Sequence, residues 1–329
     1  MKKIIPDKLK KGDEIRIIAP SRTMKLLSDE TINIAKERLE DLGFKVTFGK
    51  NVYNDMDIKY QCASIADRIE DLHDAFKDNN VKAILTVIGG FNCNQLLDYI
   101  DYDLIKNNPK IICGYSDITA LLNAIYTKTG LITYYGPHFS SFGMKKGFEY
   151  TLDYFKRMFM SNETITIENS LEWSDDAWYL DQEKRNFIKN KGTEIIQSGS
   201  IEGTIIGGNL CTLNLLQGSE YMPNINDIVL FLEDDALISD ELFKLEFDRN
   251  LQSLLHSYKN INIKALVIGR AQIKCNMTKE KWINIFETKK ELKDIPIIIN
   301  ADFGHTTPIF TFPIGGIAKI ENDKIIIKD

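Results

Sequence analysis

The sequence predicts an α/β fold, with a parallel sheet covered by helices in the first half and a second, smaller α/β domain after it. Two patterns indicate this: strands that are apolar along their whole length, and helices whose apolar residues recur on one side. Their alternation along the chain is typical of βαβ units. A length of 329 residues with 43% apolar residues is enough for two hydrophobic cores.

In the first half, apolar strands and amphipathic helices follow one another with short connections. Ser28 and Gly43 are typical of a helix start and end, because serine caps free amides and glycine accepts a left-handed backbone. The predicted strands span 14–20, 83–89, 110–115 and 131–136, and the predicted helices span 28–42, 64–77 and 117–128.

The character of the sequence changes after about residue 160, where short β-rich runs flank the polar stretch 172–192. We therefore predict an N-terminal domain over residues 1–165 and a C-terminal domain over residues 166–329. In the second domain, the predicted strands span 228–233, 264–269, 296–301 and 324–328, and the predicted helices span 209–217, 239–257 and 278–290.

Composition and charge narrow the class of protein. The net charge of −6, with basic and acidic residues interspersed, lacks the clustered Lys and Arg that bind phosphate backbones, so we expect no nucleic-acid partner. Lysines, Pro6 and Asp7 interrupt the N-terminal apolar pairs, and no apolar run is long enough to span a membrane. Five scattered cysteines without a C-x-x-C pair indicate reduced thiols rather than disulfides or a zinc site. We expect a cytoplasmic protein.

Ser116 is the candidate nucleophile. It lies in ICGYSDIT, where an apolar strand meets a helix at the carboxyl edge of the predicted parallel sheet, the edge at which open α/β folds bind ligands. The run resembles a nucleophile elbow, although Ile118 stands where the last glycine of G-x-S-x-G belongs. Capping of the following helix by Ser116 explains the same pattern equally well.

A serine hydroxyl needs a base within hydrogen-bond reach and a group that orients this base. Of the four histidines, His73 and His256 lie inside predicted helices and are expected to be structural or surface residues. His138 follows a strand end, and His305 follows the strand PIIIN in a loop next to a glycine. We prefer His305 as the base and keep His138 as the alternative.

Glu233 is the candidate orienting acid, because it ends the apolar strand IVLFL and would be held rigidly there. Asp234 and Asp235 follow it, so a magnesium-binding edge or a solvated helix start remain open at this point.

The amides of Gly90 and Asp117 are the candidate donors to the oxyanion formed on attack. Gly89-Gly90 directly follows the strand AILTVI, and backbone without side chains can approach a substrate closely. A simple strand-ending turn is the alternative interpretation. The chain contains neither G-x-G-x-x-G nor G-x-x-x-x-G-K-[ST], so no motif for a nucleotide cofactor accompanies the βαβ pattern.

Six runs, in this order along the chain, resemble the LD-carboxypeptidase family of serine peptidases: VIGGFNCNQLL, GYSDITALLNAI, TYYGPHFSSFG, GTIIGGNLCTLNLLQG, FLEDD and DFGHTTP. The resemblance implies an N-terminal Rossmann-like domain that carries the serine, and a C-terminal domain that carries the acid and the histidine, with the active site between them. It places the family's triad on Ser116, Glu233 and His305, and its oxyanion amides on Gly90 and Asp117.

The insertion LEWSDDAWYLDQEKRNFI resembles the branch of microcin C immunity proteins within this family. The resemblance implies a loop tryptophan that stacks on a nucleobase, for which Trp178 is the first candidate and Trp173 the second. Both could instead anchor the insertion. Gly207-Gly208-Asn209 is expected to line the site, with Asn209 as a substrate-binding residue, although helix capping by Asn209 explains this run almost as well.

These observations support a hypothesis of a Ser-His-Glu hydrolase, without metal or organic cofactor, that cleaves an amide in an aminoacyl-nucleotide toxin related to microcin C. One alternative is an LD-carboxypeptidase that removes terminal D-Ala from a murein tetrapeptide. Others are a non-catalytic protein that binds a nucleotide-peptide and a magnesium-dependent hydrolase. The expected partner is a small peptide or aminoacyl-nucleotide substrate, and the family resemblance implies a homodimer.

Overall fold

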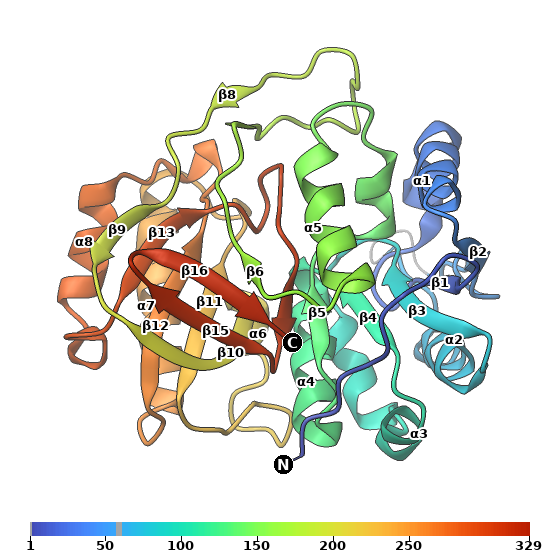
Figure 1. Ribbon diagram of the computed structural model, residues 1–329, viewed down its shortest axis with the longest axis horizontal. Coiled ribbons are helices and arrows are strands. Elements are labelled where there is room, and N and C mark those ends of the chain that lie inside the picture. The colour runs from blue at the N-terminus through green and yellow to red at the C-terminus, as the bar shows by residue number, and fades with distance from the viewer. Residues whose placement is uncertain (1, 57–60) are drawn as a thin grey trace.

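The computed structural model of the chain describes residues 2–56 and 61–329 and contains two main sheets, one built mostly by each half of the sequence (Figure 1). The first sheet has the order β14-β5-β4-β3-β1-β2. Its first five strands along the chain are parallel, and β14 pairs antiparallel with β5. The members are β1 (Glu14–Ile18), β2 (Lys45–Phe48), β3 (Val81–Thr86), β4 (Ile111–Gly114), β5 (Thr133–Tyr135) and β14 (Phe312–Ile314).

Helices connect the parallel strands as the alternation predicts. Ser28 caps the first helix by accepting a hydrogen bond from the Thr31 amide, and Gly43 follows its end with φ +93°. The predicted helix 117–128 is divided into a short 3-10 turn and an α-helix. The helices of this half are α1 (Asp29–Asp41), α2 (Ile65–Lys77), α3 (Tyr102–Asn107), α4 (Thr119–Thr129) and α5 (Glu149–Met160), with 3-10 turns η1 (Met24–Leu26), η2 (Cys93–Tyr99), η3 (Ser116–Ile118) and η4 (Phe139–Gly143).

The second sheet is mixed and has the order β6-β16-β15-β10-β11-β12-β13-β9. The four strands from β10 to β13 are parallel, and the rest pair antiparallel. They are β6 (Ile165–Thr166), β9 (Glu194–Gln197), β10 (Ile201–Asn209), β11 (Ile228–Glu233), β12 (Ile263–Gly269), β13 (Ile297–Ala301), β15 (Ile317–Glu321) and β16 (Lys324–Lys328).

The helices of the second half are α6 (Leu210–Asn214), α7 (Asp240–Ser257) and α8 (Lys279–Glu287), with turns η5 (Ile273–Cys275) and η6 (Lys290–Leu292). The polar stretch after residue 171 forms only the two-stranded ribbon of β7 (Glu172–Trp173) and β8 (Ile188–Lys189), which Figure 1 shows as an excursion at the top of the molecule. The α/β class with a parallel sheet is therefore confirmed, whereas β14 and β15 are strands that the sequence patterns did not reveal.

Helix α4 holds the two sheets together. It contacts β5 of the first sheet, and β10 and α6 on the side of the second. Nearly all of its residues are buried, which explains why the run TALLNAIY is apolar on several sides instead of on one stripe. Because α4 directly follows η3, Ser116 lies where the two halves of the molecule meet.

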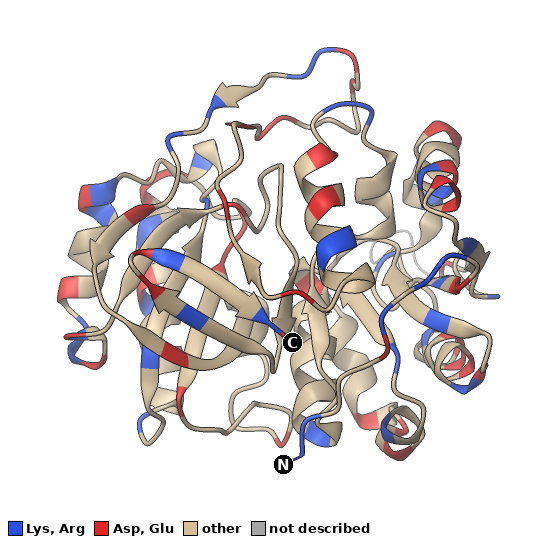
Figure 2. Cartoon of the chain, viewed as in Figure 1, with Lys and Arg blue, Asp and Glu red and all other residues tan. Residues whose placement is uncertain are grey.

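Basic and acidic side chains are interspersed over both halves, as Figure 2 shows. Within the described residues, no helix is both long enough and apolar enough to cross a lipid bilayer.

Candidate active site

Ser116 lies in a sharp turn between β4 and α4. Its φ of +60° is the left-handed conformation that non-glycine residues adopt only under local constraint, as in a nucleophile elbow. Gly114 permits this turn, because a Cβ there would lie 2.3 Å from the Thr86 Oγ1. The capping alternative is wrong: Tyr115 and Ile118 occupy the cap positions of η3 and α4, and the Ser116 hydroxyl is instead directed at His305.

Ser116, His305 and Glu233 form a continuous hydrogen-bonded chain. The His305 Nε2 lies 3.0 Å from the Ser116 Oγ, and the His305 Nδ1 lies 2.6 Å from the Glu233 Oε2. Glu233 is the last residue of β11, and His305 is in the loop after β13. When Nδ1–H donates to Glu233, the Nε2 lone pair can accept the serine proton.

The buried carboxylate of Glu233 controls the charge of His305. Burial alone would lower the pKa of His305, but the charge of Glu233 and its hydrogen bond raise this pKa to about 9. Burial would raise the pKa of Glu233, and the charge and hydrogen bond of His305 lower it instead. Each partner therefore stabilises the charged form of the other.

Tyr135, which the sequence patterns did not reveal, fixes this carboxylate, and two glycines leave room for it. The Tyr135 hydroxyl, from β5 of the first sheet, donates to the Glu233 Oε1 at 2.7 Å. A Cβ at Gly304 would lie 2.8 Å from the Glu233 Oε2, and one at Gly269 would lie 2.8 Å from the Glu233 Cβ. In sequence, Tyr135 looks like an ordinary apolar core residue of a strand, so no local signal distinguishes it.

The other histidines do not join this chain. The His138 Nδ1 is 2.8 Å from the Thr86 Oγ1, and burial lowers the pKa of His138 well below 6.5, so it is neutral. Its ring stacks on Tyr115 with centroids 4.2 Å apart, and its buried Nε2 has no hydrogen-bond partner among the residues that the structure describes. His73 accepts from the Asp101 amide, and His256 is exposed on α7, as expected for structural and surface residues.

The glycine pair lies next to the serine. A Cβ at Gly89 would lie 3.1 Å from the Ser116 Oγ, so any side chain there would crowd the hydroxyl. The Asp117 carboxylate is buried and accepts hydrogen bonds from the Ser21 hydroxyl and from the amides of Asn92 and Cys93. These bonds tie the turn that carries Ser116 to the segment that follows Gly90.

Asp234 and Asp235 adjoin Glu233 and could hold a cation together with Cys211, since one ligand atom of each lies within 4.8 Å of the others. Burial, with the charges of Glu233 and Asp235, raises the pKa of Asp234 to about 7. Asn209 lies against this group: its side chain caps α6 by accepting from the Thr212 amide and donates to the Asp234 Oδ1 at 3.2 Å. The structure thus gives Asn209 the capping position considered from the sequence.

The two tryptophans of the insertion differ in how they are held. The Arg270 guanidinium lies 5.0 Å from the Trp173 ring centroid, and the same arginine is paired with the buried Asp302. Trp178 is half-buried beside the exposed Tyr179. The amide of Ser174 donates to the Thr307 carbonyl at 2.7 Å, so the insertion lies against the loop that carries His305.

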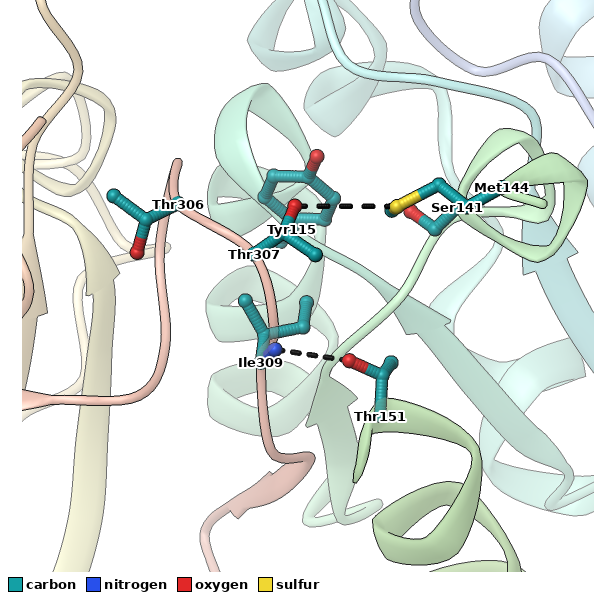
Figure 3. A pocket seen from close by; sticks show the side chains of 7 residues that line it. All are labelled: Tyr115, Ser141, Met144, Thr151, Thr306, Thr307 and Ile309. Atoms are coloured by element: carbon teal, nitrogen blue, oxygen red, sulfur yellow. Dashed lines mark hydrogen bonds between the residues drawn. The ribbon is translucent and has the colours of Figure 1, made fainter. Parts of the chain in front are cut away.

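A small cavity borders the site, as Figure 3 shows. Its volume of about 20 Å³ can hold roughly one water molecule and no substrate. Two of its lining residues, Tyr115 and Thr306, are the chain neighbours of Ser116 and His305. The full lining is Tyr115, Ser141, Met144, Thr151, Thr306, Thr307 and Ile309.

Known protein families match both halves of the chain. The family model described as the LD-carboxypeptidase N-terminal domain matches residues 15–136, and that of the LD-carboxypeptidase C-terminal domain matches residues 202–320. Among relatives, a protein of Bacillus subtilis named "Putative carboxypeptidase YocD" is 54% identical over 95% of both chains.

Two further relatives carry more specific names. The microcin C7 self-immunity protein MccF of Escherichia coli is 32% identical over 95% of this chain and 91% of its own. The murein tetrapeptide carboxypeptidase of Pseudomonas aeruginosa is 23% identical over 94% of each.

Solved structures agree with these matches. An MccF-like protein from Bacillus anthracis has a TM-score of 0.94 and 54% identity, with 98% of each chain covered. MccF in complex with aspartyl sulfamoyl adenosine has a TM-score of 0.87 and 31% identity, with 99% of this chain and 98% of that chain covered.

Proposed function

The chain belongs to the LD-carboxypeptidase family of serine peptidases, and on this basis we propose that it hydrolyses the amide bond of an aminoacyl-nucleotide related to microcin C, with Ser116 as nucleophile. The observation that carries the proposal is the hydrogen-bonded chain from the Ser116 Oγ through His305 to Glu233. Such a chain supplies a nucleophile, a base and the group that orients the base.

Neutral His305 takes the Ser116 proton while Oγ forms a bond to the scissile carbonyl carbon. The same proton then passes from the His305 Nε2 to the leaving nitrogen as the C–N bond breaks, which leaves an acyl group on Ser116. A water molecule repeats the sequence, with His305 again as base, and releases the acid. Glu233 stays ionised and stabilises the imidazolium that forms in each half of the reaction.

The oxyanion formed in each step is stabilised by the amides of Gly90 and Asp117. The left-handed backbone at Ser116 and the hydrogen bonds of the Asp117 carboxylate support this role, because they hold the turn in one conformation before substrate arrives. One such donor contributes about 3 kcal/mol to lowering the barrier.

The aminoacyl-nucleotide assignment rests on the similarity to MccF, which has been seen with aspartyl sulfamoyl adenosine. In this chain Trp178 stacks on the nucleobase, since Trp173 is already covered by the guanidinium of Arg270. Asn209 positions the carboxylate of Asp234, to which it donates a hydrogen bond, on the side of the site that receives the acyl group.

Removal of D-Ala from a murein tetrapeptide is the second candidate function, because a murein tetrapeptide carboxypeptidase is among the relatives. It uses the same nucleophile and base. Membership in a peptidase family makes this chain an enzyme, which sets aside the binding-protein alternative. The cytoplasmic location and the homodimer stay predictions.

The test is mass spectrometry of the products after incubation with an aminoacyl sulfamoyl adenylate and, separately, with a murein tetrapeptide. Release of the free amino acid and sulfamoyl adenosine by the wild type, and not by Ser116→Ala, is the expected result. Cleavage of the tetrapeptide alone would move the protein to cell-wall recycling, and cleavage of neither would contradict the proposed function.

A further inference from the structure

Arg22 occupies the point of the first sheet at which ligands bind in open α/β folds. The strand order β4-β3-β1-β2 shows that the chain moves from β1 to one side with β2 and then to the other side with β3. The crevice outside the carboxyl ends of the strands at such a reversal is the usual ligand site. Arg22 follows β1, while Gly89 and Gly90 follow β3, so these residues lie on the two sides of this reversal.

Arg22 is fixed to the glycine pair next to Ser116. Its Nε donates to the Gly89 carbonyl at 3.1 Å, and its backbone amide donates to the same oxygen at 3.4 Å. A Cβ at Gly90 would lie 2.9 Å from the Arg22 Cγ. A Cβ at Gly89 would also lie 3.1 Å from the Ser116 Oγ. Gly89 therefore lies between the guanidinium group of Arg22 and the hydroxyl of Ser116.

The charge of Arg22 is not neutralised by the part of the chain that the structure describes. Arg16, Arg185 and Arg270 each form a salt bridge with a carboxylate. For Arg22, residues 2–56 and 61–329 provide a carbonyl oxygen and the ring of Phe91, whose centroid is 5.9 Å from the guanidinium carbon, and no Asp or Glu salt bridge.

The positive charge of Arg22 extends into the site. Burial lowers the pKa of His138, and the charges of His305 and Arg22 lower it further. The acidic residues Asp234 and Asp235 belong to the second sheet, after β11, whereas Arg22 belongs to the first. The site therefore has a cation on one side and carboxylates on the other. This favours a substrate whose anionic group faces Arg22 and whose cationic group faces Asp234 and Asp235.

Both candidate substrate classes carry an anion on the leaving side, and the aminoacyl-nucleotide class also carries a cation on the acyl side. An aminoacyl group carries an α-ammonium on the acyl side of the scissile bond. On the leaving side, a terminal amino acid carries its carboxylate two bonds from the leaving nitrogen. A phosphoramidate carries its charged oxygens on the phosphorus bonded to that nitrogen, and an acyl sulfamate shares the charge of its ionised nitrogen with the sulfonyl oxygens. An arginine fork suits either anion, because two of its nitrogens can donate to two oxygens at once.

We propose that Arg22 binds the anionic group attached to the leaving nitrogen, a carboxylate or a phosphoryl-like group, and selects substrates that carry it. This rests on the proposed function for the position of the scissile bond. Nε donates to the Gly89 carbonyl, and within residues 2–56 and 61–329 the two terminal nitrogens have no hydrogen-bond partner, so they are available to the anion. Arg22 acts by direct contact with the substrate. The same contact would serve both substrate classes, because each carries an anion on the leaving side.

The test compares each charged substrate with a neutral counterpart. A murein tetrapeptide that ends in D-Ala is paired with the same peptide ending in D-alaninamide. An aminoacyl sulfamoyl adenosine is paired with the aminoacyl amide of 5′-amino-5′-deoxyadenosine. For the class that the wild type cleaves, kcat/KM is measured with wild type, Arg22→Gln and Arg22→Lys.

Arg22→Gln should lower the preference for the charged over the neutral substrate, measured as the ratio of their kcat/KM values, by roughly 10- to 100-fold. Arg22→Lys, which keeps the charge and loses the fork, should recover part of the preference. An equal loss on both substrates would show that Arg22 only supports the Gly89 turn, and an unchanged preference would show that another group binds the anion. Either result overturns the inference.

Binding to the Ser116→Ala variant separates this inference from the proposed function, because it needs no turnover. Calorimetric titration with all four compounds, with and without Arg22→Gln, should show tighter binding of the charged member of a pair only when Arg22 is present. If this holds but the wild type cleaves nothing, the proposed function fails and the anion site stands. If charge makes no difference to binding, the anion site fails whatever the enzyme cleaves.

Discussion

Replacement of Glu233 by Gln should change both the rate and its pH dependence. The substitution keeps the size of the side chain and an oxygen that can accept from the His305 Nδ1–H, and removes only the charge. In the wild type, the raised His305 pKa of about 9 stands more than two units above the ordinary value of 6.5. At about 1.4 kcal/mol per unit, the protonated imidazole is stabilised by about 3 kcal/mol.

Two consequences follow for kcat/KM, which reports the ionisation of the free enzyme. In the wild type it should rise with pH up to about 9, because neutral His305 is the base. In Glu233→Gln the rising limb should move down toward pH 6.5, because the largest influence that opposes burial of His305 is lost and only the charges of Asp235 and Asp234 still raise its pKa. The maximal value should fall about 10³- to 10⁴-fold, the scale found when the acid of a serine triad is neutralised.

Together these effects predict that the loss of kcat/KM in Glu233→Gln, relative to the wild type, depends on pH. At pH 10 the variant should show the full loss, whereas at pH 7, where only about 1% of wild-type His305 is neutral, the deficit should be roughly 100-fold smaller. The assay is kcat/KM between pH 5.5 and 10.5, with Tyr135→Phe as matched control, because it removes a hydrogen bond to Glu233 and keeps the charge. The control should shift the limb by less than about one unit.

Thermal melting supplies a second readout with a defined sign. Because the folded-state pKa of His305 is raised, its stabilising contribution is full below pH 6.5 and is lost as pH rises through about 9. The melting temperature of the wild type should fall over this interval more than that of Glu233→Gln. A rising limb of kcat/KM that stays in place in the variant, or a deficit that is equal at all pH values, would refute this account of the pair.

Four further predictions concern the surroundings of the triad. Gly89→Ala should lower kcat about 10-fold or more, measured by steady-state kinetics, because the new methyl would lie 3.1 Å from the Ser116 Oγ; an unchanged kcat contradicts the close approach. Asp302→Ala should lower the free energy of unfolding by about 3–5 kcal/mol in urea titrations, because it leaves a buried arginine unpaired; a loss below 1 kcal/mol contradicts this. Asp234→Asn should raise the melting temperature more at pH 8 than at pH 5, because the raised folded-state pKa of about 7 makes ionisation of Asp234 oppose folding as pH rises. The activity of the wild type should withstand a chelator, and its loss would favour the magnesium alternative. Trp178→Ala should raise KM for a nucleotide substrate about 10-fold with little change on a tetrapeptide, and equal effects on both would count against base stacking.

The sequence reveals residues that follow strand ends more readily than residues inside strands. Ser116, Glu233 and His305 each come after a continuously apolar run, and the carboxyl ends of parallel strands collect side chains at one edge. Their type and place were therefore predictable. Tyr135 and Arg22 were not, since each acts through a contact with a residue about 70 to 100 positions away.

The strand β14 shows a similar limit for the fold. Its three residues include Pro313 and precede a glycine pair, which resembles a turn more than a strand. It forms because β5 offers an open edge to which the chain returns after completing β13. Only the tertiary arrangement supplies this partner, so local periodicity cannot predict it.

The most direct test of the central claim, that Ser116 is the activated nucleophile, is mass spectrometry of the protein after reaction with a fluorophosphonate. We expect one adduct, located on the peptide that contains Ser116, with loss of turnover in proportion to labelling and no adduct in Ser116→Ala. An adduct elsewhere, or full turnover by protein that is labelled at Ser116 or carries alanine there, would contradict the serine mechanism.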